Sequence, residues 1–147
     1  MTAADSNDAQ RGASVRVAVR ADLEYLHIFR GVAELVSTAA GFDFDATDDL
    51  RLAVDEIAAT LIEISEKGAD VECEFTENGE YLHIELRAHD AVGQLPKSTN
   101  FRWHIVKTLA DDLSWDEVPV VPAADSGAHS YKTVVRIAKR KATTTGG

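Results

Sequence analysis

The feature that most constrains the fold of this chain is a pair of alternating stretches near its middle. Apolar and polar residues alternate from Val71 to Glu77 and again from Tyr81 to Ala88, and Asn78-Gly79 lies between them. A period of two is typical of a strand with one buried face, and both turn residues tolerate positive φ. Residues 71–88 are therefore predicted to form an antiparallel β-hairpin.

Upstream of the hairpin, the sequence predicts one strand and two helices. Residues 14–20 (SVRVAVR) alternate valines with polar residues and predict a strand. Apolar residues spaced by three and four then predict a helix over 22–39, capped by its first residue and ended by Gly41. The same spacing predicts a second helix over 45–66, opened by Asp45.

Downstream of the hairpin, a polar connection over 89–99 leads to a predicted helix over 100–111. A strand around 113–118, a loop over 119–128 with two prolines, and a last strand over 130–138 follow. The predicted order is β-α-α-β-β-α-β-β. It indicates an α/β (α+β) sandwich, in which helices cover one face of an antiparallel-rich mixed sheet.

Length and composition indicate one globular domain. The chain has 147 residues, of which 45% are hydrophobic and 27% charged, as in ordinary soluble domains. We expect a folded domain over 14–138 and disordered tails over 1–13 and 139–147. No apolar run approaches the roughly 18 residues of a membrane span, and the N-terminal residues lack a signal peptide's apolar centre. A cytoplasmic location is expected.

Charge and the metal-binding residue types narrow the function classes. The net charge of −10 opposes nucleic acid binding and suits a basic protein partner, although solubility alone explains it equally well. The five histidines are scattered without metal-ligand spacing, so no zinc site is predicted. The single cysteine, Cys73, lies on the apolar side of a predicted strand and is expected in the core.

Three stretches carry a resemblance to a known family. They are residues 49–63 (DLRLAVDEIAATLIE), residues 100–115 (NFRWHIVKTLADDLSW) and residues 28–32 (IFRGV). Together with the order of elements, they resemble the RsbW/SpoIIAB-type anti-sigma factors, which have the GHKL (Bergerat) ATPase fold and act as serine kinases. The similarity is greatest to the actinobacterial, UsfX-like branch. It spans about 14–138, and the order and spacing of the motifs carry it.

The resemblance implies a site for ATP and Mg²⁺ on the predicted helix 45–66. Glu56 matches the residue taken as the general base for phosphoryl transfer, and Thr60 stands where the family has a Mg²⁺-binding asparagine. Positions i and i+4 share a helical face, so both side chains can serve one site. Thr60 is a weak Mg²⁺ ligand because its hydroxyl is shorter than a carboxamide. A solvated helix face is the alternative for Glu56.

The nucleotide motifs continue after the hairpin. Asp90 and Gly93 fall where the family has its adenine-binding Asp-x-Gly-x-Gly, although a plain surface loop explains Asp90 equally well. Asn100 and Arg102 fall where two glycines cradle phosphate, and the guanidinium of Arg102 is suited to pair with a phosphate. Four positions depart from the family's pattern: Thr60, Val92, Asn100 and Arg102. They predict that kinase turnover is weak or lost.

The resemblance also implies protein partners. Arg30 matches the arginine by which the family contacts the sigma factor and its antagonist, and His27 and Glu34 would form a polar rim. An ordinary solvated charge also explains Arg30. The implied function is sequestration of an alternative (stress, SigF-type) sigma factor, ended by a STAS-domain anti-anti-sigma protein, with homodimer formation. The alternatives are an active ATP-dependent serine-protein kinase that phosphorylates the antagonist, and an adaptor without a sigma partner.

Overall fold

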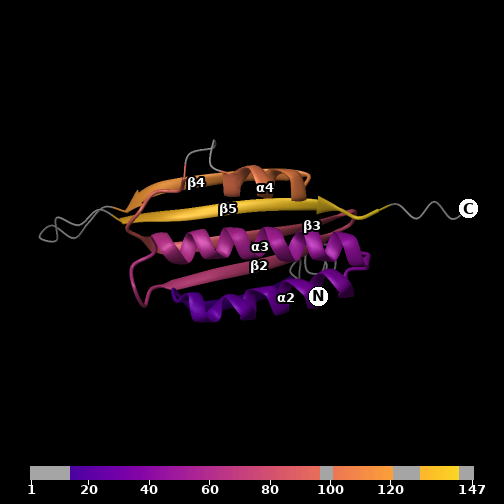
Figure 1. Cartoon of the computed structure of the whole chain (residues 1–147), viewed down its shortest axis with the longest axis horizontal. Coiled ribbons are helices and arrows are strands. Elements are labelled where there is room, and N and C mark those ends of the chain that lie inside the picture. The colour runs from indigo at the N-terminus through magenta and orange to yellow at the C-terminus, as the bar shows by residue number, and fades with distance from the viewer. Residues whose placement is uncertain (1–13, 97–100, 121–129, 143–147) are drawn as a thin grey trace, which may run out of the picture.

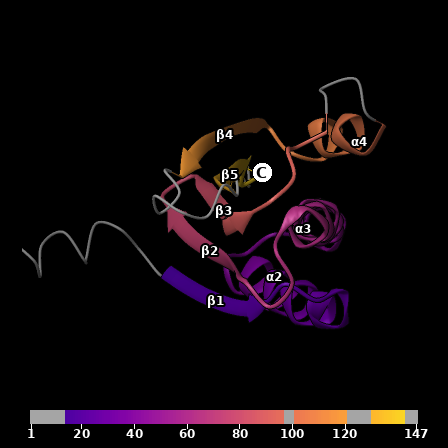
Figure 2. The same cartoon turned by 90° about the vertical axis from the view of Figure 1, so that its left-hand side faces the viewer.

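The computed structural model describes residues 14–96, 101–120 and 130–142. These residues form two layers, a five-stranded sheet and the α-helices that cover one of its faces (Figure 1). Seen along the sheet, all the helices lie on the same side of the strands (Figure 2). The predicted fold class and order of elements are confirmed, with one short 3-10 helix added before the first α-helix.

Every strand pair in the described sheet is antiparallel, and the spatial order is β1-β2-β3-β5-β4. The strands are β1 (Ser14–Arg20), β2 (Asp70–Asn78), β3 (Tyr81–Ala91), β4 (Asp112–Val120) and β5 (Ser130–Arg140). Two strands run two residues beyond the predicted ends, β4 through Pro119 to Val120 and β5 to Arg140. Proline is tolerated at this place because β4 is an edge strand.

The β2–β3 hairpin is confirmed, but the predicted turn was wrong by one residue. Asn78 pairs with Tyr81, so the two-residue loop consists of Gly79 and Glu80. Gly79 has φ +55, and no described residue other than glycine has a positive φ. A glycine with positive φ at the first loop position is typical of a type II′ turn.

The helical elements are the 3-10 helix η1 (Leu23–Tyr25) and the α-helices α2 (Leu26–Ala39), α3 (Phe44–Ile64) and α4 (Phe101–Leu109). Asp22 caps the first of these as predicted, since its side chain accepts a hydrogen bond from the backbone N–H of Glu24. The predicted cap of α3 at Asp45 was wrong. Asp43 has the extended backbone of a cap and accepts from the N–H of Ala46 at 2.8 Å.

The core lies between the helices and the sheet. Its largest fully buried side chains come from α2, α3, the central strands and α4: Phe29, Leu50, Ile57, Leu61, Phe75, Leu82, Ile84, Leu86, Val106 and Ile137. Cys73 is fully buried among them, as predicted, and burial raises the pKa of its thiol. The thiolate form is therefore suppressed, which removes Cys73 from consideration as a nucleophile.

The other face of the sheet carries ion pairs that follow the strand register. Arg16 of β1 is 2.9 Å from the Glu74 carboxylate of β2, and Arg87 of β3 is 2.6 Å from it. Farther along, Arg136 of β5 is 2.8 Å from Asp116 of β4. The two arginines beside Glu74 donate hydrogen bonds to its carboxylate and lower its pKa. This face is thus polar, whereas the helices cover the apolar one.

Candidate functional site

One face of α3 brings together Glu56, Thr60 and Glu63. They occupy positions i, i+4 and i+7, which fall on the same side of a helix. The Thr60 side chain is buried, and its hydroxyl donates a hydrogen bond to the backbone carbonyl of Glu56 at 2.9 Å. The predicted juxtaposition of Glu56 and Thr60 is therefore present.

Arg102 reaches this face of α3 from the first turn of α4. Its Nε lies 2.9 Å from Oε2 of Glu56, and its Nη1 lies 3.3 Å from Oε2 of Glu63. Nη1 also donates to the Thr60 hydroxyl oxygen at 3.3 Å. One guanidinium thus joins three side chains of α3. Glu63 was not among the predicted site residues, and its only signal in the sequence was its position seven residues after Glu56.

Aromatic packing holds α4 in place beside α3. Trp103 follows Arg102 and is 4% exposed, and its ring stacks on Trp115 of β4 with centroids 5.5 Å apart and planes 22° apart. Val106, one turn later, is buried in the main core. Because the neighbour of Arg102 is anchored in this way, the guanidinium is directed to the face of α3.

The predicted adenine-binding segment lies at the C-terminal end of α3. β3 continues through Asp90 to Ala91, so the connection begins three residues later than predicted. The carbonyl of Asp90 accepts from the N–H of Glu66 at 2.8 Å, and the N–H of Gly93 donates to the carbonyl of Ile64 at 3.0 Å. These backbone bonds tie the segment to α3, while the Asp90 side chain is exposed. Asn100 lies outside the described residues.

These residues do not fit a Mg²⁺–nucleotide complex in the observed arrangement. Mg²⁺ requires oxygen ligands at about 2.0–2.1 Å in octahedral geometry. The Glu56 carboxylate holds Arg102 instead, and the Thr60 hydroxyl accepts from Arg102 while donating to its own helix. Glu63 adds a second carboxylate, which repels a triphosphate. Glu56 is present, but the geometry supports no phosphoryl-transfer step at this place.

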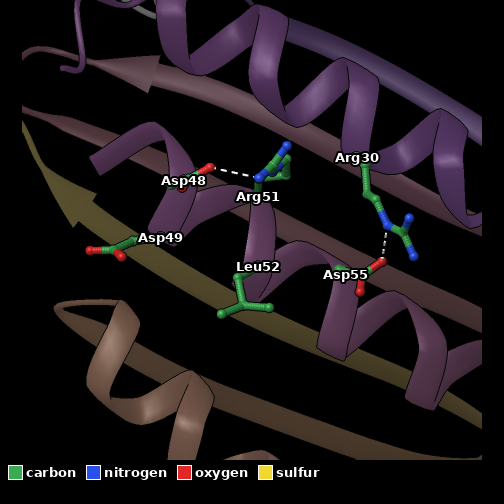
Figure 3. Close-up of a pocket in the computed structure, with 6 residues that line it drawn as sticks. All are labelled: Arg30, Asp48, Asp49, Arg51, Leu52 and Asp55. Carbon is green, nitrogen blue, oxygen red and sulfur yellow. Dashed lines mark hydrogen bonds and ion pairs between the residues drawn. The ribbon is translucent and has the colours of Figure 1, made fainter. Parts of the chain in front are cut away.

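The predicted partner-binding arginine lies on the outer face of the helix layer. Arg30 extends from α2 toward α3, and its Nε is 2.5 Å from Oδ1 of Asp55 (Figure 3). The Arg30 side chain is 49% exposed. It borders an open hollow of about 400 Å³, lined by Arg30, Asp48, Asp49, Arg51, Leu52 and Asp55. The Arg30 side chain is therefore accessible to a partner at the edge of a surface hollow.

Glu34 borders two neighbouring hollows on the same helix layer, one of them about 350 Å³ and lined also by Phe44. Two large apolar side chains that line these hollows are exposed to solvent: Phe44 is 81% exposed and Leu35 is 71% exposed. We name this region the α2–α3 outer surface: Arg30, Glu34, Leu35, Phe44, Asp48, Asp49, Arg51, Leu52 and Asp55. Exposed apolar groups rimmed by charges are typical of protein-binding surfaces.

The other predicted partner residue, His27, is also exposed, and its Nδ1 lies 2.7 Å from the carbonyl of Glu24. Leu35 and Phe44 were not among the predicted partner residues. Leu35 was recognisable as an apolar residue outside the buried stripe of α2, which includes Phe29 and Ala33. Phe44 gave no comparable signal, since a cap residue was expected at Asp45.

Neither a membrane span nor a metal cluster is found in the part of the chain that the structure describes. No helix there has the length and apolar character needed to cross a bilayer. Within the same residues, no group of three or more His, Cys, Asp or Glu side chains is arranged to hold a metal ion.

The two-layer fold, with helices on one face of an antiparallel sheet, is compatible with the GHKL-like α/β sandwich. No family model matches the sequence. Among curated proteins, the chain is similar to the anti-sigma-F factor RsbW from two strains of Mycobacterium tuberculosis, with 33% identity over 105 residues in each. The match covers 71% of this chain and 62% of each relative. The chain is thus similar to the RsbW-type anti-sigma factors over most of its length, and the resemblance predicted from its motifs is confirmed.

Proposed function

We propose that this chain is an anti-sigma factor that sequesters an alternative, stress-type sigma factor from RNA polymerase in the cytoplasm. Its similarity to the anti-sigma-F factor RsbW supports the proposal, although the match spans less than two thirds of that protein. The observation that carries the proposal in the structure is the α2–α3 outer surface. It combines Arg30, at the position that the resemblance assigns to partner contact, with exposed apolar side chains.

The charge of this surface suits a basic partner. Four acidic residues line its hollows against two arginines, Arg30 and Arg51, and the whole chain carries a net charge of −10. Sigma factors bind DNA and therefore present basic surface, and complementary charge accelerates and orients association. Phe44 supplies the apolar contact, since full burial of such a side chain contributes about 1.5–3 kcal/mol.

Release of the sigma factor is proposed to follow from competition by a STAS-domain anti-anti-sigma protein for an overlapping surface. In the pair between Arg30 and Asp55 the arginine side chain is 49% exposed and the aspartate side chain 22% exposed, and ion pairs in contact with solvent contribute only about 0–1 kcal/mol. A partner carboxylate can therefore replace Asp55 at Arg30 with little loss. A homodimer formed around β1 and the first helix completes the proposal, because β1 is an edge strand of the sheet.

The second candidate function is an ATP-dependent serine-protein kinase that phosphorylates the antagonist. The retained Glu56, which lies beside Thr60 on α3, favours it. We propose instead that the ATP site is degenerate, because the contacts of Arg102 occupy both residues. Transfer of labelled phosphate from Mg-ATP to the antagonist, abolished in Glu56→Ala, would establish the kinase and reject the degenerate site.

The anti-sigma function is tested by capture of partners from the native cell. The full chain is tagged, recovered from cells grown under several stress conditions, and its partners are identified by mass spectrometry. We expect an alternative sigma factor among the partners of the wild type and its depletion from those of Arg30→Glu. Recovery of no sigma factor under any condition would contradict the proposal and favour the adaptor without a sigma partner.

A further inference from the structure

We infer that Arg102 is a built-in cation of the α3–α4 site, which takes the place of a metal ion and fixes α4 on α3 without a nucleotide. The inference rests on the proposed function only in assigning this face of α3 to the nucleotide site of the family. The guanidinium itself lies 2.9 Å from the carboxylate of Glu56 and 3.3 Å from that of Glu63. No such role follows from the degenerate motifs alone.

The negative charge on α3 favours this role of Arg102. Glu56 and Glu63 place two carboxylates on one helix face, next to a buried hydroxyl. A cation between these oxygens interacts favourably with both carboxylates, because charge-assisted hydrogen bonds are stronger than neutral ones. Arg102 supplies that cation, with Nε directed at one carboxylate and Nη1 at the other. An arginine stays charged at every physiological pH, so this cation is permanent.

A diffusible metal ion competes poorly with Arg102 for these carboxylates. Arg102 belongs to the same chain as the carboxylates, so its effective concentration at the site is far above that of a free ion. Trp103, buried and stacked on Trp115, holds the backbone next to it. A Mg²⁺–nucleotide complex must displace the guanidinium and leave its charge beside the incoming metal. The affinity for Mg-nucleotide is therefore low in the wild type.

The hydrogen bonds of Thr60 predict the order in which substitutions at this site take effect. Thr60 Oγ1 accepts from Arg102 and donates to the carbonyl of Glu56. Replacement of Thr60 by asparagine alone leaves the guanidinium in place and does not restore a metal ligand. Removal of the guanidinium comes first, and the longer side chain helps only afterwards. This order of effects distinguishes a built-in cation from a site that is merely short of one ligand.

The experiment is isothermal titration of the full chain with Mg-ATP, and with ATP in EDTA. Wild type, Thr60→Asn and the control Lys107→Ala, which removes an exposed charge from the same helix, are expected to show no saturable binding up to about 1 mM. Arg102→Ala is expected to gain Mg-dependent binding, and Thr60→Asn with Arg102→Ala to bind at least about tenfold more tightly still. Micromolar binding by the wild type would overturn the inference. So would a folded Arg102→Ala, alone and with Thr60→Asn, that gains nothing.

Hydrogen exchange of the α4 amides supplies the second measurement, which needs no nucleotide binding. Arg102→Ala is expected to exchange faster over 101–109 than the wild type, Lys107→Ala to exchange as the wild type does, and Mg-ATP to leave wild-type exchange unchanged. Protection of wild-type α4 by Mg-ATP, or unaltered exchange in Arg102→Ala, would overturn the inference. Capture of sigma factor by the wild type is assayed on the same preparations. Its absence would reject the proposed function without touching the result for Arg102.

Discussion

Asp55 and Glu56 are neighbours on α3, yet their side chains turn to different helices and meet different arginines. Asp55 faces α2 and pairs with Arg30 on the open outer surface (Figure 3). Glu56 faces α4 and pairs with Arg102. Successive helical residues are about 100° apart around the axis, so adjacent acids can serve two separate sites.

The two arginines differ in how many groups hold them. Arg102 contacts Glu56, Glu63 and the buried Thr60, whereas Arg30 pairs with the carboxylate of Asp55 on the outer surface. A guanidinium with several partners is costly to displace, and an exposed pair exchanges partners readily. Arg102 is therefore held between α3 and α4, whereas Arg30 is accessible on the outer surface, as the two proposals require.

The largest effect expected from this comparison is on sigma binding by Arg30→Glu. The substitution places an acid beside Asp55 at the proposed contact, and we expect the Kd for the sigma factor to rise at least about 30-fold, or about 2 kcal/mol. Titration of purified sigma factor measures it, with Arg140→Glu, an arginine 52% exposed on β5, as the matched control. Unchanged affinity with an intact thermal transition would remove Arg30 from the interface.

The next largest effect is on folding stability in Arg102→Glu. An acid at this position faces Glu56 and Glu63, so we expect the free energy of unfolding to fall by about 1–2 kcal/mol. Urea unfolding followed by tryptophan fluorescence reports it, since Trp103 and Trp115 stack next to the site. Arg30→Glu is expected to stay within about 0.5 kcal/mol of the wild type. An equal loss of unfolding free energy in the two variants would show that Arg102 and Arg30 contribute alike to folding stability.

A smaller effect is expected for the apolar part of the outer surface. Phe44→Ser and Leu35→Ser remove side chains that are 81% and 71% exposed, so stability should change by less than about 0.5 kcal/mol. Each is expected to weaken sigma binding by about fivefold, or about 1 kcal/mol. Leu23→Ser, at a leucine 51% exposed in η1, is the control. Wild-type affinity in both variants would confine the interface to the charged end of the surface.

Sequence reasoning reached the fold because its signals are local. Alternation over 71–88 defined the hairpin, and the spacing of apolar residues defined α2 and α3. The two details that were predicted wrongly, the hairpin turn and the cap of α3, depend on other parts of the chain. The turn was wrong by one residue because cross-strand pairing of Asn78 with Tyr81 sets it, and the cap of α3 was wrong because two aspartates, Asp43 and Asp45, compete there.

Only part of the candidate site could be predicted from local sequence patterns. Glu56 and Thr60 share a face through helical periodicity alone, and this was predicted. The contact of Arg102 with Thr60 joins residues 42 positions apart. It depends on the packing of Trp103 against Trp115, which no local pattern encodes. The exposure of Phe44 likewise depends on what α2 leaves uncovered.

Arg87 extends the comparison to an arginine that is paired with three carboxylates, and the smallest effect is expected there. It lies on the sheet face away from the helices, paired with Glu72, Glu74 and Glu85. Hydrogen bonds from Arg87 and Arg16 lower the pKa of Glu74 below its unfolded value. Its ionised form therefore stabilises the fold above a pH of about 4.3, and this stabilisation is lost as the pH falls through the folded pKa.

Glu74→Gln is expected to lower the free energy of unfolding at pH 7 by less than about 1 kcal/mol, because the pair is partly solvated. The difference from the wild type should shrink toward zero as the pH is lowered from about 5 to 3, as urea titrations at each pH will show. Sigma binding at pH 7 should be unchanged, since this face lies opposite the α2–α3 outer surface. A stability difference that is constant with pH would show that the lost contact is steric. Weakened sigma binding would extend the partner surface to both faces of the domain.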